Sequence, residues 1–149
     1  MPTTQNSRRQ WMSVLAQAPA GQLIELAQPF LALDRFTSVR APEIGLAQVR
    51  ARMGGTGNRF NLGDVTITRC VVQSANGHYG YAYIRGRNKP HALCAAQLDA
   101  LLQSDNHREA IYQQVIKPLR QTLAQQQQQR ATEAAATRVN FFTLVRGED

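Results

Sequence analysis

A run of glycines and arginines between Ala51 and Arg69 holds the residues of this sequence that are best suited to an anion. The run reads A-R-M-G-G-T-G-N-R-F-N-L-G-D-V-T-I-T-R. Glycine lets the backbone approach a ligand closely, and arginine offers a planar set of donors that fits phosphate or carboxylate. Arginine is also enriched where proteins contact each other. The candidates for anion or partner binding here are Arg50, Arg52, Gly54, Gly55, Gly57, Arg59 and Arg69.

This loop does not match the established phosphate-binding motifs. It lacks the Gly-Lys-Ser/Thr ending of a Walker loop, and no third glycine follows Gly55 and Gly57 at the spacing of the dinucleotide fingerprint. A glycine-rich hairpin connection with solvated arginines is therefore an open alternative.

A second basic cluster lies where the sequence predicts the start of a helix. Asn88 suits the N-cap position, and Pro90 is tolerated in the first turn. A helix N-terminus with free N–H groups attracts anions. Basic residues that merely face solvent are the alternative. The candidates in this cluster are Arg85, Arg87, Lys89 and His91.

The sequence contains no recognisable catalytic or metal-binding set. His78, His91 and His107 are scattered without metal-ligand spacing, and we interpret them as structural. Asp64 and Asp99 are isolated acids. We expect Asp64 to cap a turn and Asp99 to face solvent or pair with a base, rather than either acting as a general base. The predicted catalytic and metal-ligand sets are therefore empty.

The composition suits one domain with its own core, because 149 residues include 43% hydrophobic ones. The net charge of +7 favours a polyanion, an anionic substrate or an acidic partner. Lys89 and Lys117 are the only lysines, and this arginine bias favours fixed contacts and protein interfaces. Cys70 and Cys94 form no Cys-x-x-Cys motif, so buried free thiols are expected. Without a signal peptide or a long apolar run, we expect a cytoplasmic protein.

The first half of the chain predicts two helices and two strands after a disordered start at residues 1–6. Ser7 is a suitable cap for a helix from Arg8 to Gln17, and a second helix ends at Pro29. Phe36 to Arg40 reads as a short strand. Alternating apolar and polar residues predict a half-buried strand over 46–53.

A central hairpin with its turn at Asn76-Gly77 is the strongest local signal. A two-residue turn places Gln73 opposite Gly80. One face would then carry Cys70, Val72, Tyr79, Tyr81 and Tyr83, and the other Ile67, Arg69, Val71, Ala82 and Ile84. Both faces are largely apolar. We expect the helices to cover one face and a partner protein the other, the alternative being internal cover for both.

The second half predicts helices and a final strand. Helices are expected after Asn88 and over 106–117, followed by a Gln/Ala-rich helical arm over 123–138. Residues 138–146 are apolar and β-prone, which predicts a strand paired within the fold or with another subunit. The expected fold over 1–149 is α+β, with a mostly antiparallel sheet, helices on one face, and the second face and C-terminal segment at interfaces.

Four segments resemble the PhnG family, a subunit of the bacterial carbon–phosphorus lyase core complex. They are Arg9–Ala16, Ala51–Arg69, Gly80–Ala92 and Arg138–Gly147, in the order of the family. The resemblance implies an accessory, non-catalytic subunit of a transferase. The transferase forms alpha-D-ribose 1-methylphosphonate 5-triphosphate from ATP and methylphosphonate with release of adenine, in phosphonate catabolism.

The resemblance further implies a hetero-oligomer with PhnI, PhnH, PhnJ and PhnL-like subunits, and no membrane or nucleic acid. This chain would bind no cofactor of its own, because the iron–sulfur cluster and S-adenosylmethionine belong to another subunit. The interface candidates are Tyr79, Tyr81, Tyr83, Phe141, Phe142 and Arg146. The alternative function is a basic nucleic-acid-binding module, in which the strand tyrosines would stack on bases.

Overall fold

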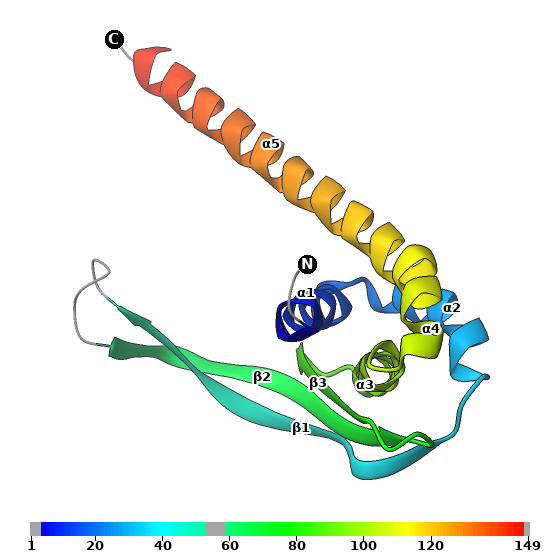
Figure 1. Ribbon diagram of the computed structural model, residues 1–149. Coiled ribbons are helices and arrows are strands. Elements are labelled where there is room, and N and C mark those ends of the chain that lie inside the picture. The colour runs from blue at the N-terminus through cyan, green and yellow to red at the C-terminus, as the bar shows by residue number, and fades with distance from the viewer. Residues whose placement is uncertain (1–3, 53–58, 148–149) are drawn as a thin grey trace.

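The computed structural model describes residues 4–52 and 59–147, and it describes the side chains of 7–48 and 63–137. The α+β class and the antiparallel sheet are confirmed (Figure 1). In chain order the elements are α1 (Thr4–Gln17), α2 (Ala20–Leu31), β1 (Phe36–Arg52), β2 (Arg59–Ser74), β3 (Tyr79–Arg85), α3 (Lys89–Leu102), α4 (Asp105–Ile111), the π-helical turn η2 (Tyr112–Ile116) and α5 (Lys117–Gly147).

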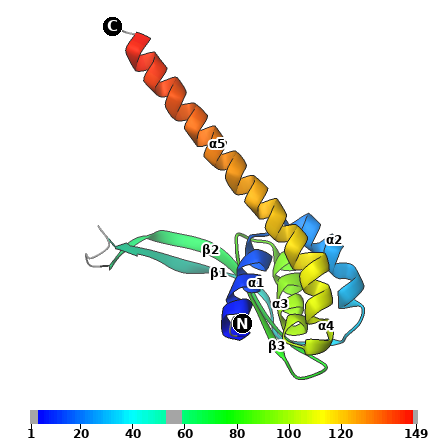
Figure 2. The same ribbon diagram turned by 45° about the horizontal axis from the view of Figure 1, so that its top comes forward.

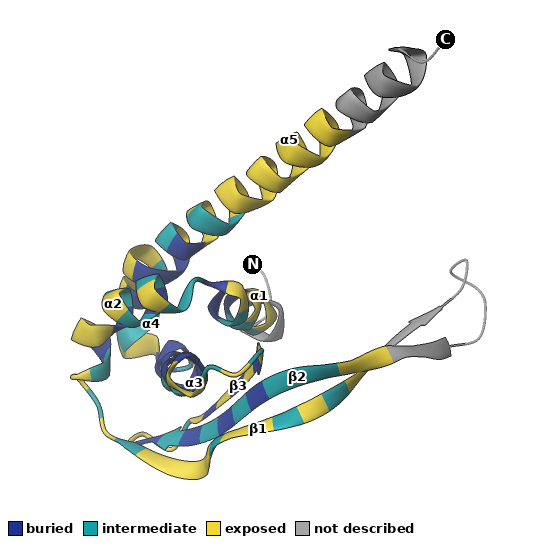
Figure 3. Cartoon of the chain, turned by 180° about the vertical axis from the view of Figure 1, so that it is seen from behind, coloured by how far each residue is buried: buried dark blue, intermediate teal, exposed yellow. Residues whose placement is uncertain are grey.

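Helix α3 is the centre of the core. It lies on one face of the sheet, whose strand order is β1-β2-β3, and α1, α2 and α4 pack around it (Figures 1 and 3). Its small residues let the sheet and the other helices approach closely: Ala92, Ala96 and Ala100 are fully buried. Larger side chains from the surrounding elements complete the core, among them Trp11, Leu15, Leu23, Val72, Ile111, Val115 and Leu119.

The hairpin of β2 and β3 is present, but the expected register is wrong by one residue. Gln73 pairs with Tyr79, not with Gly80. A slip of one residue moves side chains between faces, so the expected faces were mixed. The face under α3 carries Thr68, Cys70, Val72, Gly80, Ala82 and Ile84, all buried. The opposite face, called the outer face below, carries Ile67, Arg69, Val71, Tyr79, Tyr81 and Tyr83.

The length of the turn explains the slip. The loop contains three residues, 75–77, and is closed by a bond from the N–H of Ser74 to the carbonyl of His78. Gly77 has a φ of 89°. A three-residue loop that ends in this left-handed conformation is a common alternative to the two-residue turn. The Asn-Gly pair therefore marked the turn correctly but not its length.

The first two helices and β1 are longer than expected. Helix α1 begins at Thr4, so disorder was wrong for residues 4–6, while 1–3 lie outside the described residues. Helix α2 continues past Pro29 to Leu31. The two expected strands form one strand from 36 to 52 with three irregularities in its pairing to β2. Pro42 lies beside one of them, where a missing N–H can be tolerated.

The C-terminal segment forms a helix and not the expected strand. Helix α5 runs to Gly147 and includes residues 138–146. The Gln/Ala-rich segment is helical as expected, and because no proline or glycine interrupts it before Gly147, the helix continues through the β-prone residues. The turn η2 precedes Pro118, with the N–H of Lys117 bonded to the carbonyl of Tyr112. Such a π-helical turn lets the chain accommodate a proline without ending the helix.

Both cysteines are free and buried, as expected. Burial raises the pKa of the Cys94 thiol to about 12 and raises the pKa of Cys70 as well. We therefore expect neither thiol to react with a disulfide reagent at about pH 8 in the native protein, because thiolate is the reactive form. Both should react at once in guanidinium chloride. A fast-labelling thiol in the folded chain, measured by absorbance of the released thiol, would contradict this packing.

Within the described residues, no helix combines the length and apolar character that crossing a membrane requires.

Candidate anion- and partner-binding surfaces

The paired strands β1 and β2 extend well beyond the helices as a long arm (Figures 1 and 2). Backbone pairing of Arg52 with Arg59, and of Arg50 with Asn61, places three candidate arginines near the tip of this arm. Their side chains lie outside the described ones. The candidates Gly54, Gly55 and Gly57 lie outside the described residues. The backbone thus brings the arginines together and far from the second basic cluster.

Arg69 lies on the outer face, opposite Tyr83. Its Nε is 3.1 Å from Oε1 of Glu43, and Arg40 approaches the same carboxylate oxygen at 3.5 Å. Arg69 is therefore already paired with an acid. A half-exposed pair of this kind contributes little to stability. Arg69 can therefore leave Glu43 and pair with an acidic group of another protein.

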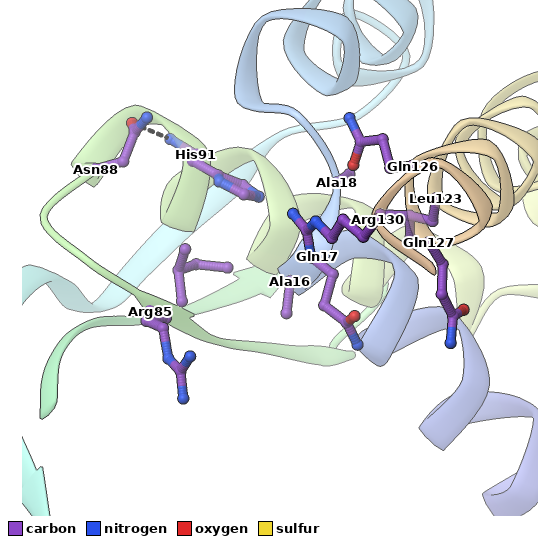
Figure 4. A pocket seen from close by; sticks show the side chains of 11 residues that line it. Ala16, Gln17, Ala18, Arg85, Asn88, His91, Leu123, Gln126, Gln127 and Arg130 are labelled. Carbon is purple, nitrogen blue, oxygen red and sulfur yellow. Dashed lines mark hydrogen bonds between the residues drawn. The ribbon is translucent and has the colours of Figure 1, made fainter. Parts of the chain in front are cut away.

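The second basic cluster borders an open cavity of about 820 Å³ (Figure 4). The cavity lies among the end of α1, the end of β3, the start of α3 and the side of α5. Arg85 and His91 line it, whereas Arg87 and Lys89 do not. The full lining comprises Ala16, Gln17, Ala18, Ile84, Arg85, Asn88, His91, Leu123, Gln126, Gln127 and Arg130.

The start of α3 is closed by its own cap. The side-chain oxygen of Asn88 accepts from the N–H of His91 at 3.0 Å, as expected for an N-cap. Pro90 has no N–H, and the N–H of Ala92 bonds to the carbonyl of Asn88. In the first turn, only the backbone N–H of Lys89 is then left without a partner among the described residues. The start of α3 therefore has fewer free N–H groups for binding an anion than the sequence suggested.

His91 has a structural role, as expected from its isolation in the sequence. Its ring is buried, and Nε2 lies 2.7 Å from the carbonyl oxygen of Leu15. A carbonyl accepts, so Nε2 carries the hydrogen. The bond fixes α3 to α1 and makes the imidazole a rigid wall of the cavity.

Arg130 is the one charged residue of the cavity lining that was not predicted from the sequence. It reaches from α5 towards α1 and the start of α3, while Arg85 lies at the end of β3 and points away from it (Figure 4). Arg130 is the only basic residue between Arg120 and Arg138. That isolation within a Gln/Ala-rich helix was a usable signal, although the sequence could not place it beside Arg85.

Asp99 joins α1, α3 and β3 and is not the isolated acid expected, although its predicted pairing with a base is confirmed. It is 0% exposed. Its oxygens accept from Nη2 of Arg8 at 2.9 Å, Nε1 of Trp11 at 2.8 Å and the N–H of Tyr81 at 2.9 Å. The hydrogen bond with Asp99 raises the pKa of Arg8. Arg8 also lies over the ring of Tyr81.

These contacts also occupy part of the free edge of β3, at Tyr79 and Tyr81. The N–H of Tyr81 points to Asp99, and the carbonyl of Tyr79 accepts from Nε2 of Gln103 at 2.6 Å. Asp64 lies inside β2, paired with Gln48, so the expected turn cap is wrong. Among the described residues, no three His, Cys, Asp or Glu side chains gather to hold a metal ion.

The family model described as "Phosphonate metabolism protein PhnG" matches residues 6–147. The chain belongs to the PhnG family. It is 43% identical over 148 residues to the "Alpha-D-ribose 1-methylphosphonate 5-triphosphate synthase subunit PhnG" of Rhizobium meliloti (strain 1021). The alignment covers 95% of this chain and 90% of that relative.

The PhnG match includes all the helices and strands described above except the first two residues of α1. In this PhnG fold the candidates Tyr79, Tyr81 and Tyr83 are exposed on the outer face. Phe141, Phe142 and Arg146 lie near the end of α5, and their side chains are outside the described ones. The tyrosines and the end of α5 belong to different parts of the PhnG surface.

Proposed function

We propose that this chain is an accessory subunit of the assembly that forms alpha-D-ribose 1-methylphosphonate 5-triphosphate from ATP and methylphosphonate, releasing adenine in phosphonate catabolism. Support comes from its PhnG family membership and from the name of the 43% identical relative, which is a synthase subunit. We further propose that it works in the cytoplasm beside PhnI, PhnH, PhnJ and PhnL-like subunits, and binds no cofactor itself.

The observation that carries the proposal is the exposure of helix α5. Its side chains from Ala124 to Thr137 are all exposed, and the helix projects from the body (Figure 3). A helix without an apolar stripe against a core gains little stability from tertiary packing. The arm of β1 and β2 projects as well. Two such projections suit a chain whose structure is completed by other subunits.

Co-expression with a PhnI subunit tests this function. We expect a stable complex whose mass, measured by light scattering, exceeds that of this chain alone. A well-folded chain that never associates with PhnI would overturn the proposal. If that chain also bound RNA with an affinity that falls steeply with salt, the nucleic-acid alternative would take its place.

The exposed tyrosines should contribute to this association. Tyr83 is 57% exposed on the outer face, and large aromatic side chains dominate protein interfaces. We expect Tyr83→Ala to weaken binding to PhnI by about 2 kcal/mol, or roughly thirtyfold, measured by titration calorimetry. Leu33→Ala is the matched control, since Leu33 is 60% exposed but lies outside the sheet. Equal affinities for the two variants would exclude the outer face as the interface.

A further inference from the structure

We propose that the cavity between α5 and the start of α3 binds the polyphosphate group of a small molecule. The inference deepens the proposed function and relies on it for the choice of a triphosphate.

The charge of the cavity lining is entirely positive. Arg85 and Arg130 line it, no aspartate or glutamate does, and neither arginine forms an ion pair with any described side chain. Unpaired positive charges in a concave site raise the local concentration of anions. Guanidinium groups bind phosphoryl oxygens through paired, charge-assisted hydrogen bonds.

Neutral donors complete the site. Gln126 and Gln127 line the cavity from α5, and their amides have no hydrogen-bond partner among the described side chains. A volume of about 820 Å³ lies within the usual range for small-molecule sites. Two cations with several amides suit an extended anion with many oxygens better than a single carboxylate.

The two arginines have different roles. Arg130 extends towards α1 and the start of α3, so it is positioned for the ligand before binding (Figure 4). Both side chains are exposed, but Arg85 points away from Arg130, so it must turn inwards to reach the same anion. Because Arg85 must change its orientation to reach the anion and Arg130 need not, Arg130 should contribute more than Arg85.

Ligand binding should also immobilise α5. The last partly buried anchor of this helix on the body is Leu123, and the described side chains after it are exposed. An anion held by Arg130 on one side and by the body on the other would add a second connection about two turns further along the helix. The amides of α5 near Arg130 should then exchange more slowly with deuterium when the anion is bound.

Titration calorimetry of the full chain with sodium tripolyphosphate tests the proposal, with ATP in a parallel titration. We expect Arg130→Gln to weaken binding at least about tenfold, and Arg85→Gln less. Arg87→Gln is the matched control, because Arg87 is exposed, close in sequence and absent from the lining. It should change affinity less than about threefold. Tighter binding of ATP than of tripolyphosphate would show that the nucleoside is held as well.

Equal losses of affinity in all three variants would mean that only net charge matters, and would overturn the proposal. No binding of tripolyphosphate, or unchanged deuterium exchange in α5, would overturn it as well. If the lone chain is insoluble, the same variants are compared within the purified complex. The outcome is separable from the proposed function. If the chain associates with PhnI but does not bind tripolyphosphate, the proposed function stands and the proposed site is wrong. If it binds tripolyphosphate but never associates with PhnI, the site stands and the proposed function is wrong.

Discussion

Replacing Asp99 with alanine is expected to lower the free energy of unfolding by about 3 to 4 kcal/mol. Asp99 is fully buried and accepts hydrogen bonds from Arg8, Trp11 and the backbone of Tyr81. Arg8 is one-third exposed and can turn to water. The indole and the backbone N–H cannot, so most of the loss comes from two donors left without an acceptor.

Urea denaturation of two variants and one control would measure this effect. Asp99→Asn keeps the shape and one acceptor oxygen, so about 2 kcal/mol is expected from it. Asp105→Asn is the control, because Asp105 also pairs with an arginine, at 3.1 Å from Arg108, but its side chain is 91% exposed. The control should change stability by less than about 0.5 kcal/mol. Similar losses at the two positions would show that burial of the Asp99 network is unimportant.

Replacing Gly80 with alanine should destabilise the fold by about 3 kcal/mol or more. An added Cβ would meet the carbonyl oxygen of Ala96, and it would lie 2.9 Å from the backbone N of Ala100. These atoms belong to helix α3, so no side chain can move aside. The sheet and the helix would have to separate at the centre of the core.

Gly21→Ala is the matched control for this substitution. Gly21 lies in α2, and nothing lies within 4 Å of a Cβ built there. Because alanine is the better helix former, a gain of up to about 1 kcal/mol is expected. The difference between the two variants in thermal or urea unfolding isolates the close approach of β3 to α3. A Gly80→Ala variant as stable as the parent would contradict the packing described.

Local signals predicted a large part of the fold. The cap at Asn88, the helical character of the Gln/Ala-rich segment and the position of the central hairpin were all correct. Each depends on residues within a few positions of one another. The turn length at Asn76-Gly77 was wrong because the same pair fits two loops, and that single residue exchanged the faces of the strands.

The parts that could not be predicted depend on distant contacts. The partners of Asp99 are 18 to 91 residues away in the sequence, so no spacing rule could connect them. The cavity combines Arg85 with Arg130, which come from a strand and from a helix taken only as an arm. The final segment was expected as a strand from its β propensity, but the helix preceding it extended through it.

The closed edge of β3 limits how copies of this chain can join. Side chains from α1 and α3 occupy that edge, whereas no described strand lies beyond β1. The regular part of β1 runs from Glu43 to Val49. If two copies pair through β1, the joined sheet ends on both sides at β3 wherever β3 covers β2, from Ile67 to Gln73. The side chains of α1 and α3 at Tyr79 and Tyr81 then hinder the addition of a further strand there, which favours a dimer over a longer edge-to-edge assembly.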